Sequence, residues 1–400
     1  MKNSTVGRMS DLEKEYVLDA VDRAFATSQN SHYNNLLEKA YAKKVGCDYA
    51  IGHVNGTATM HTALAALGVK AGDEVVVPPL TMSSTSLAVL HNGSIPVYAD
   101  VDKDTFNISA EAIEKVITEK TKAVISVSLY GLPADYEKIL SVCKKHGLYL
   151  IEDNAECFLG KYDGKTVGQF GDFASFSFQA SKHLTCGEGG MLVCRDFELA
   201  NKARQFNTLG YAGVSATKGK ISRNDIQDPN YSRHIAFGFN YRMSELQAAV
   251  ALGQLERAEE LVSLRVKVAE LFSQAVAGCS YLLPQKTPCN CTNSYWAYSM
   301  ILKTDKPESD WYAFRDLFQK NGGDGYYAAW KLSYNEPYFQ NTVQNSSGVW
   351  QKYERGLCPN AEHLQPRMIQ LKTNYWDLSE AEKQAETLAQ TIKMFAGTKG

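Results

Sequence analysis

Short apolar runs alternate with amphipathic segments through the first half of this chain, and this alternation limits the possible folds more than any other feature. Strands that alternate with helices form a mainly parallel sheet that helices cover on both faces. The crossover connections between such strands are expected to be right-handed. The strands are expected at residues 49–54, 74–77, 95–99, 123–127, 148–151, 173–178 and 191–194.

The length of the chain predicts a second domain, because 400 residues exceed what a single core usually holds. We expect a large α/β domain at residues 25–250. A smaller α+β domain is expected to comprise residues 251–400 together with the N-terminal segment 1–24. Its predicted elements are a strand at 295–302 and helices at 310–320 and 379–395.

Three other segments bear on this organisation. Residues 10–45 have apolar side chains at helical spacing, and residues 244–275 form a long helical pattern that we interpret as the bridge between the domains. Residues 210–234 are polar and mixed in charge, which predicts a long loop. A loop of this length inside a folded chain is usually functional or disordered.

Composition excludes several classes of protein. A net charge of −2 gives no general electrostatic reason to bind nucleic acid or an anionic membrane. No apolar run is long enough to span a bilayer, and the first residues lack the apolar core of a signal peptide. Nine scattered cysteines do not form the pattern of a disulfide framework, so we expect a cytoplasmic protein. No metal site is expected, because the pair Cys289 and Cys291 is too tightly spaced and has no second pair nearby.

The first chemical motif is Asn55-Gly56-Thr57-Ala58-Thr59, between a predicted strand and a predicted helix. Small residues at this point leave backbone N–H groups and a hydroxyl free at a helix N-terminus, which suits a phosphate. The alternative is an ordinary turn with a threonine as the N-cap. Taken alone, the motif favours the ordinary turn.

The second motif is Ile151-Glu152-Asp153-Asn154-Ala155-Glu156, which places carboxylates at the end of the fifth strand. Parallel α/β sheets bind ligands at the carboxyl edge of their strands. Asp153 is suited to ionise opposite a buried cation. A capping or loop carboxylate is an equally good interpretation of the motif alone.

The third motif places Lys182 five residues after Ser177 and just before Gly187-Glu-Gly-Gly190. For any single lysine, a solvated loop residue is the simplest interpretation. A lysine that forms a Schiff base must lose its proton, which requires partial desolvation or a neighbouring cation. Together the three motifs supply a phosphate cradle, an acid for a pyridinium nitrogen and an amine, as a pyridoxal 5'-phosphate enzyme requires.

The sequence resembles the DegT/DnrJ/StrS family of sugar aminotransferases, which have the aspartate aminotransferase fold (fold type I). The resemblance covers nearly the whole chain. It implies a seven-stranded, mostly parallel sheet between helices and a homodimer with both active sites at the subunit interface. The motifs that carry it are Asn55-Gly-Thr-Ala, Gly72-Asp-Glu-Val-Val-Val-Pro78, Glu152-Asp153-x-Ala155-Glu156, Ser177-Phe-x-x-x-Lys182-x-x-x-x-Gly187-Glu-Gly-Gly190, Gly238-Phe-Asn240-Tyr-Arg-Met243 and Cys358-Pro-x-Ala-Glu362.

The resemblance also implies roles for single residues. Lys182 corresponds to the lysine that forms the Schiff base and carries the proton between the substrate carbon and the cofactor. Asp153 corresponds to the acid that keeps the pyridine nitrogen protonated, and Glu156 falls near the ring hydroxyl. The phosphate contacts correspond to Gly56, Thr57, Ser177 and, from the neighbouring subunit, Asn240.

The chain departs from the family pattern where the substrate pocket is shaped. Met82 stands where relatives carry an aromatic that stacks on the cofactor, and a methionine can cover the ring through dispersion and sulfur contact. Tyrosines near residue 330, with Trp330, line a sugar pocket or pack between the domains. The other unusual segments are 28–33, 210–234, 325–330 and 371–374.

The leading hypothesis is an aminotransferase that moves an amino group from glutamate, or a similar donor, to a keto-sugar. A nucleotide-linked keto-deoxysugar or a free keto-sugar acid is the expected acceptor, for an amino sugar of a surface polysaccharide or natural product. Basic residues of the long loop could pair with a carboxylate or a pyrophosphate, although a solvated loop is the simpler interpretation for most of them. They are Lys218, Lys220, Arg223 and Arg233.

Two alternatives stay open. Relatives that act as keto-deoxysugar 3-dehydratases replace the Schiff-base lysine with histidine, and His183 follows Lys182 directly. The count from Ser177 and to Gly187 favours Lys182. The second alternative is a regulator that binds the cofactor without turnover, because fold alone does not prove function.

Overall fold

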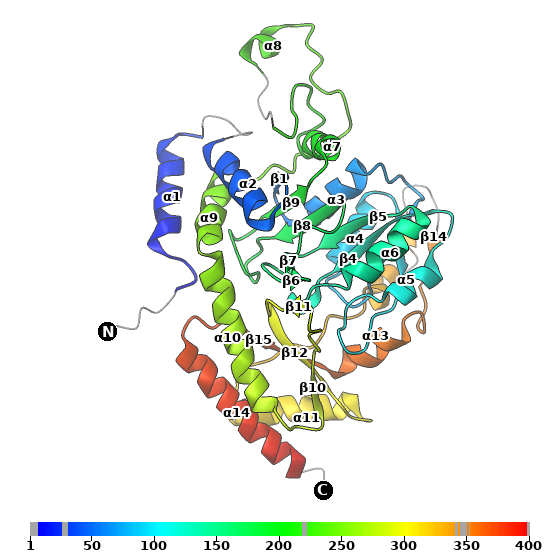
Figure 1. Ribbon diagram of the computed structural model, residues 1–400, viewed down its shortest axis with the longest axis vertical. Helices are drawn as coiled ribbons and strands as arrows, with labels where there is room; N and C mark the ends of the chain where they lie inside the picture. Colours follow the sequence, from blue (N-terminus) through cyan, green and yellow to red (C-terminus); the bar gives the residue numbers. More distant parts are fainter. Residues whose placement is uncertain are drawn as a thin grey trace.

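The computed structural model describes residues 7–25, 31–217, 222–340, 343–344, 350–351 and 353–397. Its largest sheet has seven strands in the order β1-β9-β8-β5-β4-β2-β3 (Figure 1). Neighbours from β8 through β3 are parallel, whereas β9 is antiparallel to both β8 and β1. The predicted seven-stranded, mostly parallel sheet is therefore confirmed. The strands are β1 (Tyr49–His53), β2 (Glu74–Val77), β3 (Ile95–Tyr98), β4 (Thr121–Val127), β5 (Tyr149–Asp153), β8 (Phe173–Ser177) and β9 (Gly190–Cys194).

Helices cover both faces of this sheet, as the alternating pattern predicted. Along β2, Val75 and Val77 join one apolar core and Val76 joins the other, because successive side chains of a strand point to opposite faces. The first core also contains side chains of α3 (Gly56–Ala66), α4 (Ser84–His91) and α7 (Phe197–Asn207). The second contains side chains of α2 (His32–Val45), α5 (Ala110–Val116), α6 (Tyr136–His146) and α9 (Glu245–Glu256).

A second, antiparallel sheet has the order β10-β12-β15 and lies below the large sheet in Figure 1. A third apolar core lies between this sheet and the helices α10 (Ala258–Val276), α11 (Pro307–Lys320) and α14 (Leu378–Gly397). The expected smaller α+β unit is thus present. The domain limits of 24/25 and 250/251 stay predictions. The strands are β10 (Leu282–Pro284), β12 (Ala297–Leu302) and β15 (Met368–Lys372).

Two segments that were predicted as continuous helical patterns each contain two helices. The segment 10–45 contains two helices, α1 (Asp11–Asp22) and α2, and residues 26–30 between them lie outside the described residues. The bridge predicted at 244–275 consists of α9 and α10, which are separated at Arg257, where φ is −101° and ψ is 11°. Apolar spacing continues across this point, so the period alone did not reveal the break.

The remaining elements are short. The segment 210–234, of which 218–221 are not described, holds one short helix, α8, and projects away from the rest of the molecule in Figure 1. In the described part of the chain no helix is both long and apolar enough to cross a membrane. The other elements are β6 (Lys161–Tyr162), β7 (Lys165–Thr166), β11 (Cys291–Thr292), β13 (Val343–Gln344), β14 (Trp350–Gln351), α8 (Arg223–Gln227), α12 (Pro337–Gln340), α13 (Pro359–Leu364), η1 (Leu129–Gly131), η2 (Ser333–Asn335) and η3 (Gln365–Arg367).

Adjacent carboxylates at the end of β5 have different uses. Glu152 is fully buried, and its two oxygens accept hydrogen bonds from the backbone N–H groups of Gly168, Phe170 and Gly171 at 2.7–2.8 Å. A buried charge is tolerated when its acceptor sites are filled in this way. Glu152 therefore fixes the loop after β7 to the sheet, while Asp153 points to the opposite side of the strand.

We predict that Glu152→Gln lowers the free energy of unfolding by about 3 kcal/mol, because an amide nitrogen would face buried N–H donors that then lack an acceptor. The measurement is urea denaturation of the variant and of the exposed control Glu119→Gln, which is expected to match the unchanged chain. Equal stability of the two variants would contradict this account of the loop.

Candidate active site

A cavity of about 840 Å³ opens at the carboxyl edge of the large sheet. The strands β1, β2, β4, β5 and β8 end there, and the second sheet closes the far side. The three predicted motifs meet in this cavity although more than a hundred residues separate the first from the last. The lining residues include Asn55, Gly56, Thr57, Thr81, Met82, Asp153, Glu156, Ser177, Gln179, Lys182, Arg265, Trp296, Tyr327, Trp330, Gln370 and Lys372.

The first turn of α3 forms one end of the cavity. Asn55 is its N-cap and accepts from the N–H of Ala58 at 2.8 Å, so the expected alternative of a threonine cap was wrong. Helix geometry leaves the N–H groups of Gly56 and Thr57 without an acceptor in the helix, which suits an anion. Ser177 packs against this turn, since a Cβ at Gly56 would lie 3.0 Å from the Ser177 Cβ.

The glycine cluster after the lysine has a steric reason. A Cβ on Gly190 would lie 2.6 Å from the carbonyl carbon of Asn55, a distance that real side chains do not reach. Gly187 has a φ of 85°, in the left-handed region that favours glycine. The two glycines let the chain between β8 and β9 turn back beneath the first turn of α3, and this places Lys182 beside it.

Asp153 lies in the cavity wall at the end of β5. Its oxygens accept hydrogen bonds from the Thr85 hydroxyl at 2.9 Å and from the Ala155 N–H at 3.2 Å. Burial raises the pKa of the Asp153 carboxyl, and these two bonds and the charge of Lys182 oppose that rise. A buried carboxylate of this kind is stabilised by a cation placed beside it in the cavity.

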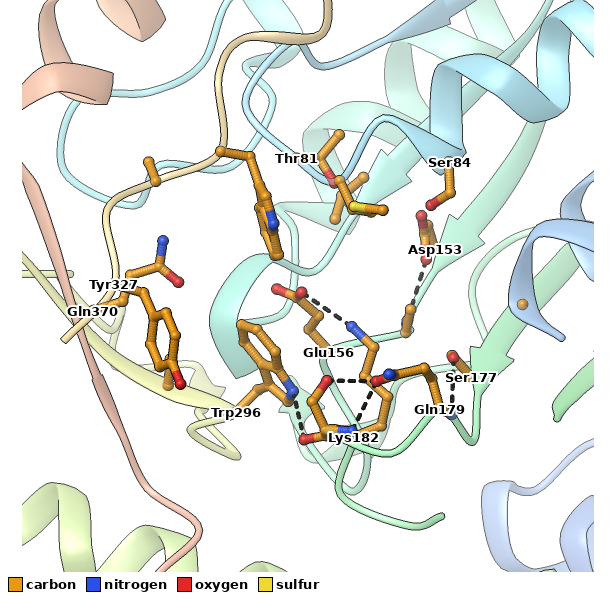
Figure 2. Close-up of a pocket in the computed structure, with 18 of the residues that line it drawn as sticks. Thr81, Ser84, Asp153, Glu156, Ser177, Gln179, Lys182, Trp296, Tyr327 and Gln370 are labelled. Atoms are coloured by element: carbon orange, nitrogen blue, oxygen red, sulfur yellow. Dashed lines mark hydrogen bonds and ion pairs between the residues drawn. The ribbon is translucent and has the colours of Figure 1, made fainter. Parts of the chain in front are cut away.

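Lys182 occupies the centre of the cavity, between Glu156 and Trp296 (Figure 2). Its Nζ lies 3.2 Å from Glu156 Oε1 and 4.6 Å from the centre of the Trp296 ring. The side chains of Lys182 and Glu156 are only 13% and 5% exposed. Burial raises the pKa of Glu156, while the charge of Lys182 opposes the rise. The lysine is a desolvated amine with a cation–π contact, so the interpretation as a solvated loop residue was wrong.

The Glu156 carboxylate is held from its other side by Tyr130. The N–H of Tyr130 donates to Glu156 Oε2 at 3.2 Å, and the backbone there has a φ of 61°. A buried non-glycine residue in this region stores strain of about 1–3 kcal/mol, which is common at functional sites. The Tyr130 ring lies against Trp296 and Trp330, with ring centres 6.2–6.3 Å apart, and these three rings form an aromatic cluster at the cavity.

His183 points away from the cavity that Lys182 occupies. Its side chain is buried, and Nε2 forms a 2.9 Å hydrogen bond with the Ser294 carbonyl. Burial, with help from Arg265, lowers the pKa of His183 well below its usual range. In this arrangement the lysine, not the histidine, reaches the cavity, which removes the sequence argument for a 3-dehydratase.

Other predicted residues fall into three groups. Met82 lines the cavity and is 50% exposed, and the wall also includes Tyr327, Trp330, Leu371, Lys372 and Asn374. Asn240 is exposed and is absent from the cavity lining of its own chain, and its backbone forms a bridge with Thr208. Arg223 and Arg233 are exposed on the projecting segment, whereas Lys218, Lys220 and residues 28–30 lie outside the described residues.

Sequence reasoning missed several residues of the cavity. Gln370 lies on β15 of the second sheet and Trp296 directly precedes β12, and no motif linked either residue to the lysine. Arg265 did leave a signal, because it is a lone cation among the apolar positions of α10, between Leu261 and Val268. A charged residue on the apolar face of an amphipathic helix needs buried partners.

The residues present fit pyridoxal phosphate in three chemical respects. The first turn of α3 with Ser177 offers N–H and hydroxyl donors to a phosphate, Asp153 offers a buried carboxylate to a protonated ring nitrogen, and Lys182 offers an amine to an aldehyde. These groups meet in one cavity because β1, β9, β8 and β5 are neighbours in the sheet. Fold and site together define an enzyme of fold type I that depends on pyridoxal phosphate.

Residues 8–388 match the DegT/DnrJ/EryC1/StrS aminotransferase family, and the chain belongs to this family. It is therefore a pyridoxal phosphate-dependent sugar aminotransferase of amino-sugar biosynthesis. It is similar to GDP-perosamine synthase of Escherichia coli O157:H7, with 37% identity over 73% of this chain and 75% of that protein. The GDP-perosamine synthase of Caulobacter vibrioides is 39% identical over 68% of each chain. The crystal structure of 3-amino-5-hydroxybenzoic acid synthase superposes with a TM-score of 0.84, at 26% identity and over 96% of this chain and 97% of that one.

We predict that Asp153→Asn stabilises the cofactor-free protein, and that the gain depends on pH. The folded-state pKa of Asp153 is raised above the unfolded value of about 3.9, so the wild-type protein loses stability as pH rises from that value through the folded-state pKa. Asparagine does not ionise: its Oδ1 can still accept from the Ala155 N–H, and its Nδ2 can donate to the Thr85 hydroxyl, which reverses the direction of that bond.

The measurement is the free energy of unfolding of both proteins from pH 4 to pH 8, without cofactor. The advantage of Asp153→Asn is expected to grow with pH and then level off. An exposed control, Asp305→Asn, is expected to show no such trend. A constant difference between wild type and Asp153→Asn would mean that Asp153 is not held in a desolvated site.

Proposed function

We propose that this enzyme transfers the amino group of glutamate to the keto group of a nucleotide-linked deoxysugar. The observation that carries the proposal is the desolvated Lys182 amine, held 3.2 Å from Glu156 in a cavity that Asp153 and the first turn of α3 also line. When bound, pyridoxal phosphate supplies an aldehyde that condenses with amines and a ring that accepts an electron pair.

The side chains would divide the work as follows. Lys182 holds the amine that bonds to the cofactor, and its Nζ later takes the proton from the donor carbon and returns one to the product carbon. Asp153 would keep the ring nitrogen protonated through an ion pair, and Glu156 would hold the ring hydroxyl. Gly56, Thr57 and Ser177 would bind the phosphate, and Met82 would cover the ring.

Two rings of the aromatic cluster, Trp296 and Trp330, line the cavity and support a sugar as the acceptor, whereas Tyr130 is fully buried behind them. Flat apolar ring faces pack against the C–H face of a sugar, and Gln370, whose Nε2 lies 3.1 Å from the Tyr130 hydroxyl, adds a polar group to the same wall. The similarity to two proteins named GDP-perosamine synthase favours a nucleotide-linked acceptor over a free keto-sugar acid. A cytoplasmic location stays a prediction.

The experiment is a two-part assay of the pyridoxal phosphate-loaded protein. Glutamate alone is expected to shift the absorbance of the bound cofactor, with release of one 2-oxoglutarate per site. A panel of nucleotide-linked keto-sugars and free keto-sugar acids, each incubated with glutamate, is then screened for an amino product by mass. Lys182→Ala is expected to retain the fold and form no product.

Two results would overturn parts of this proposal. An absorbance band that is indifferent to glutamate and to every other amino acid would exclude the amino-donor reaction. An amino product formed only from keto-sugar acids would replace the acceptor class.

We further propose a homodimer in which Asn240 of each chain completes the phosphate site of the other. Asn240 does not line its own cavity, and the apolar side chains of Ile235 and Phe237 just before it are exposed, Phe237 at 79%. Such adjacent exposed apolar residues usually mark a protein interface. Phe237 packs only on Phe206 and Phe239, with ring centres 6.4 Å and 5.3 Å apart, among the described aromatic residues.

We predict that Phe237→Glu converts the protein from dimer to monomer and weakens retention of pyridoxal phosphate, because a buried unpaired carboxylate opposes association. Sedimentation velocity gives the mass, and dialysis followed by absorbance gives the retained cofactor. The control Phe197→Glu, at an exposed site on α7, is expected to stay dimeric. A dimeric Phe237→Glu with full cofactor would contradict the proposed interface.

A further inference from the structure

Arg265 is the largest fully buried side chain of the protein described here, although it carries a charge. It lies on α10 with 2% of its surface exposed. Among the described residues it forms no ion pair with a carboxylate, and its four hydrogen bonds all go to carbonyl or hydroxyl oxygens. Burial, and secondarily Arg8, lowers the pKa of Arg265 to about 9. A buried guanidinium without a counter-charge is costly, so its partners indicate what it is for.

One side of the guanidinium holds the lysine loop. Arg265 Nη2 donates to the carbonyl oxygens of Ser181 and Lys182, both at 3.1 Å. A second guanidinium reaches the same place, because Arg8 Nη2 donates to the Lys182 carbonyl at 3.0 Å. Two charged donors therefore fix the backbone from which the Lys182 side chain extends.

The other side of the guanidinium holds the indole that contacts the lysine amine. Arg265 Nη1 donates to the Trp296 carbonyl at 2.9 Å and to Thr373 Oγ1 at 3.2 Å. The Trp296 indole N–H donates back to the Ser181 carbonyl at 3.0 Å, and Figure 2 shows this bond as the dashed line from the Trp296 indole. These contacts form a closed ring, in which one guanidinium sets both the origin of the lysine side chain and the surface against which its amine lies.

We propose that Arg265 is a positioning residue for Lys182, which couples the second sheet to the lysine loop and sets where the amine reaches in the cavity. The proposal rests on the proposed role of Lys182 as the amine that bonds to the cofactor. Arg265 lies at the cavity wall, but its Nη donors are bound to protein oxygen atoms. It acts through the carbonyl groups of the loop and of Trp296.

The experiment compares Arg265→Met, Arg265→Lys and Arg8→Met with a matched control, Arg204→Met. Arg204 is also largely buried, at 13% exposure, but it pairs with Glu38 and does not contact the lysine loop. The first measurement is hydrogen exchange of the cofactor-free protein at the amides of Lys182 and Cys186, which donate to Gln179 and Phe178 within the loop. The second is the rate at which added pyridoxal phosphate attaches to Lys182, followed by absorbance.

Arg265→Met is expected to raise exchange of the loop amides at least about tenfold and to slow attachment of the cofactor about a hundredfold, as a displacement near 1 Å does to a reacting group. Arg265→Lys keeps a charged donor at this position, so loop exchange and the attachment rate are expected to lie between those of Arg265→Met and wild type. Arg8→Met removes one of two donors and gives a smaller change of the same kind. Arg204→Met lowers the melting temperature and leaves both loop properties unchanged.

Normal loop exchange and a normal attachment rate in folded Arg265→Met would overturn the proposal, even if its melting temperature fell. If Arg265→Met does not fold, Arg265→Lys and Arg8→Met decide by the same two measurements, and wild-type values in both would overturn it. Failure of wild-type protein to attach the cofactor at Lys182 would instead contradict the proposed function. Hydrogen exchange would still test the positioning of the loop in that case.

Discussion

The buried contact between the Lys182 amine and the Glu156 carboxylate is held in place by groups from distant parts of the chain. The two atoms are 3.2 Å apart, and both side chains are almost fully removed from solvent. A charged pair in such a place is stable only when further bonds satisfy its remaining polar atoms. Here the backbone N–H of Tyr130, whose backbone conformation is strained, donates to the carboxylate, and the face of Trp296 covers the ammonium.

The sheet topology explains why these groups meet. β1, β5 and β8 run in the same direction, so their carboxyl ends deliver the first turn of α3, Asp153 and the start of the lysine loop to one edge. Adjacent residues of β5 point to opposite sides of the strand, so Glu152 binds the loop after β7 and Asp153 faces the cavity. The segment just before β12 adds Trp296 and α10 adds Arg265, so the cavity is shared by both parts of the chain.

Much of this arrangement could be predicted from the sequence, because local patterns carry it. All seven strands of the large sheet followed from short apolar runs. The cavity contains Gly56, Thr57, Met82, Asp153, Glu156, Ser177 and Lys182, which the motifs and the family resemblance named from the sequence. The break between α9 and α10 was missed, because it occurs without glycine or proline.

The site residues that could not be predicted from the sequence depend on contacts between distant segments. Trp296 and Arg265 lie about a hundred residues from the lysine loop, and no spacing rule connects them to it. A contribution of Asn240 to the site of a second copy of the chain stays a proposal. The sequence also could not show whether Lys182 or His183 faces the cavity, because adjacent residues of a loop can point in opposite directions. The contacts of Lys182 with Glu156 and of His183 with Ser294 show that the lysine does.

Borohydride reduction followed by peptide mapping tests the central claim most directly. The protein is incubated with pyridoxal phosphate, reduced, digested and analysed by mass spectrometry. The account predicts one reduced pyridoxyl group per chain, attached to the peptide that contains Lys182. Attachment mainly at another lysine, or no attachment at all, would contradict the assignment of this cavity as the catalytic site.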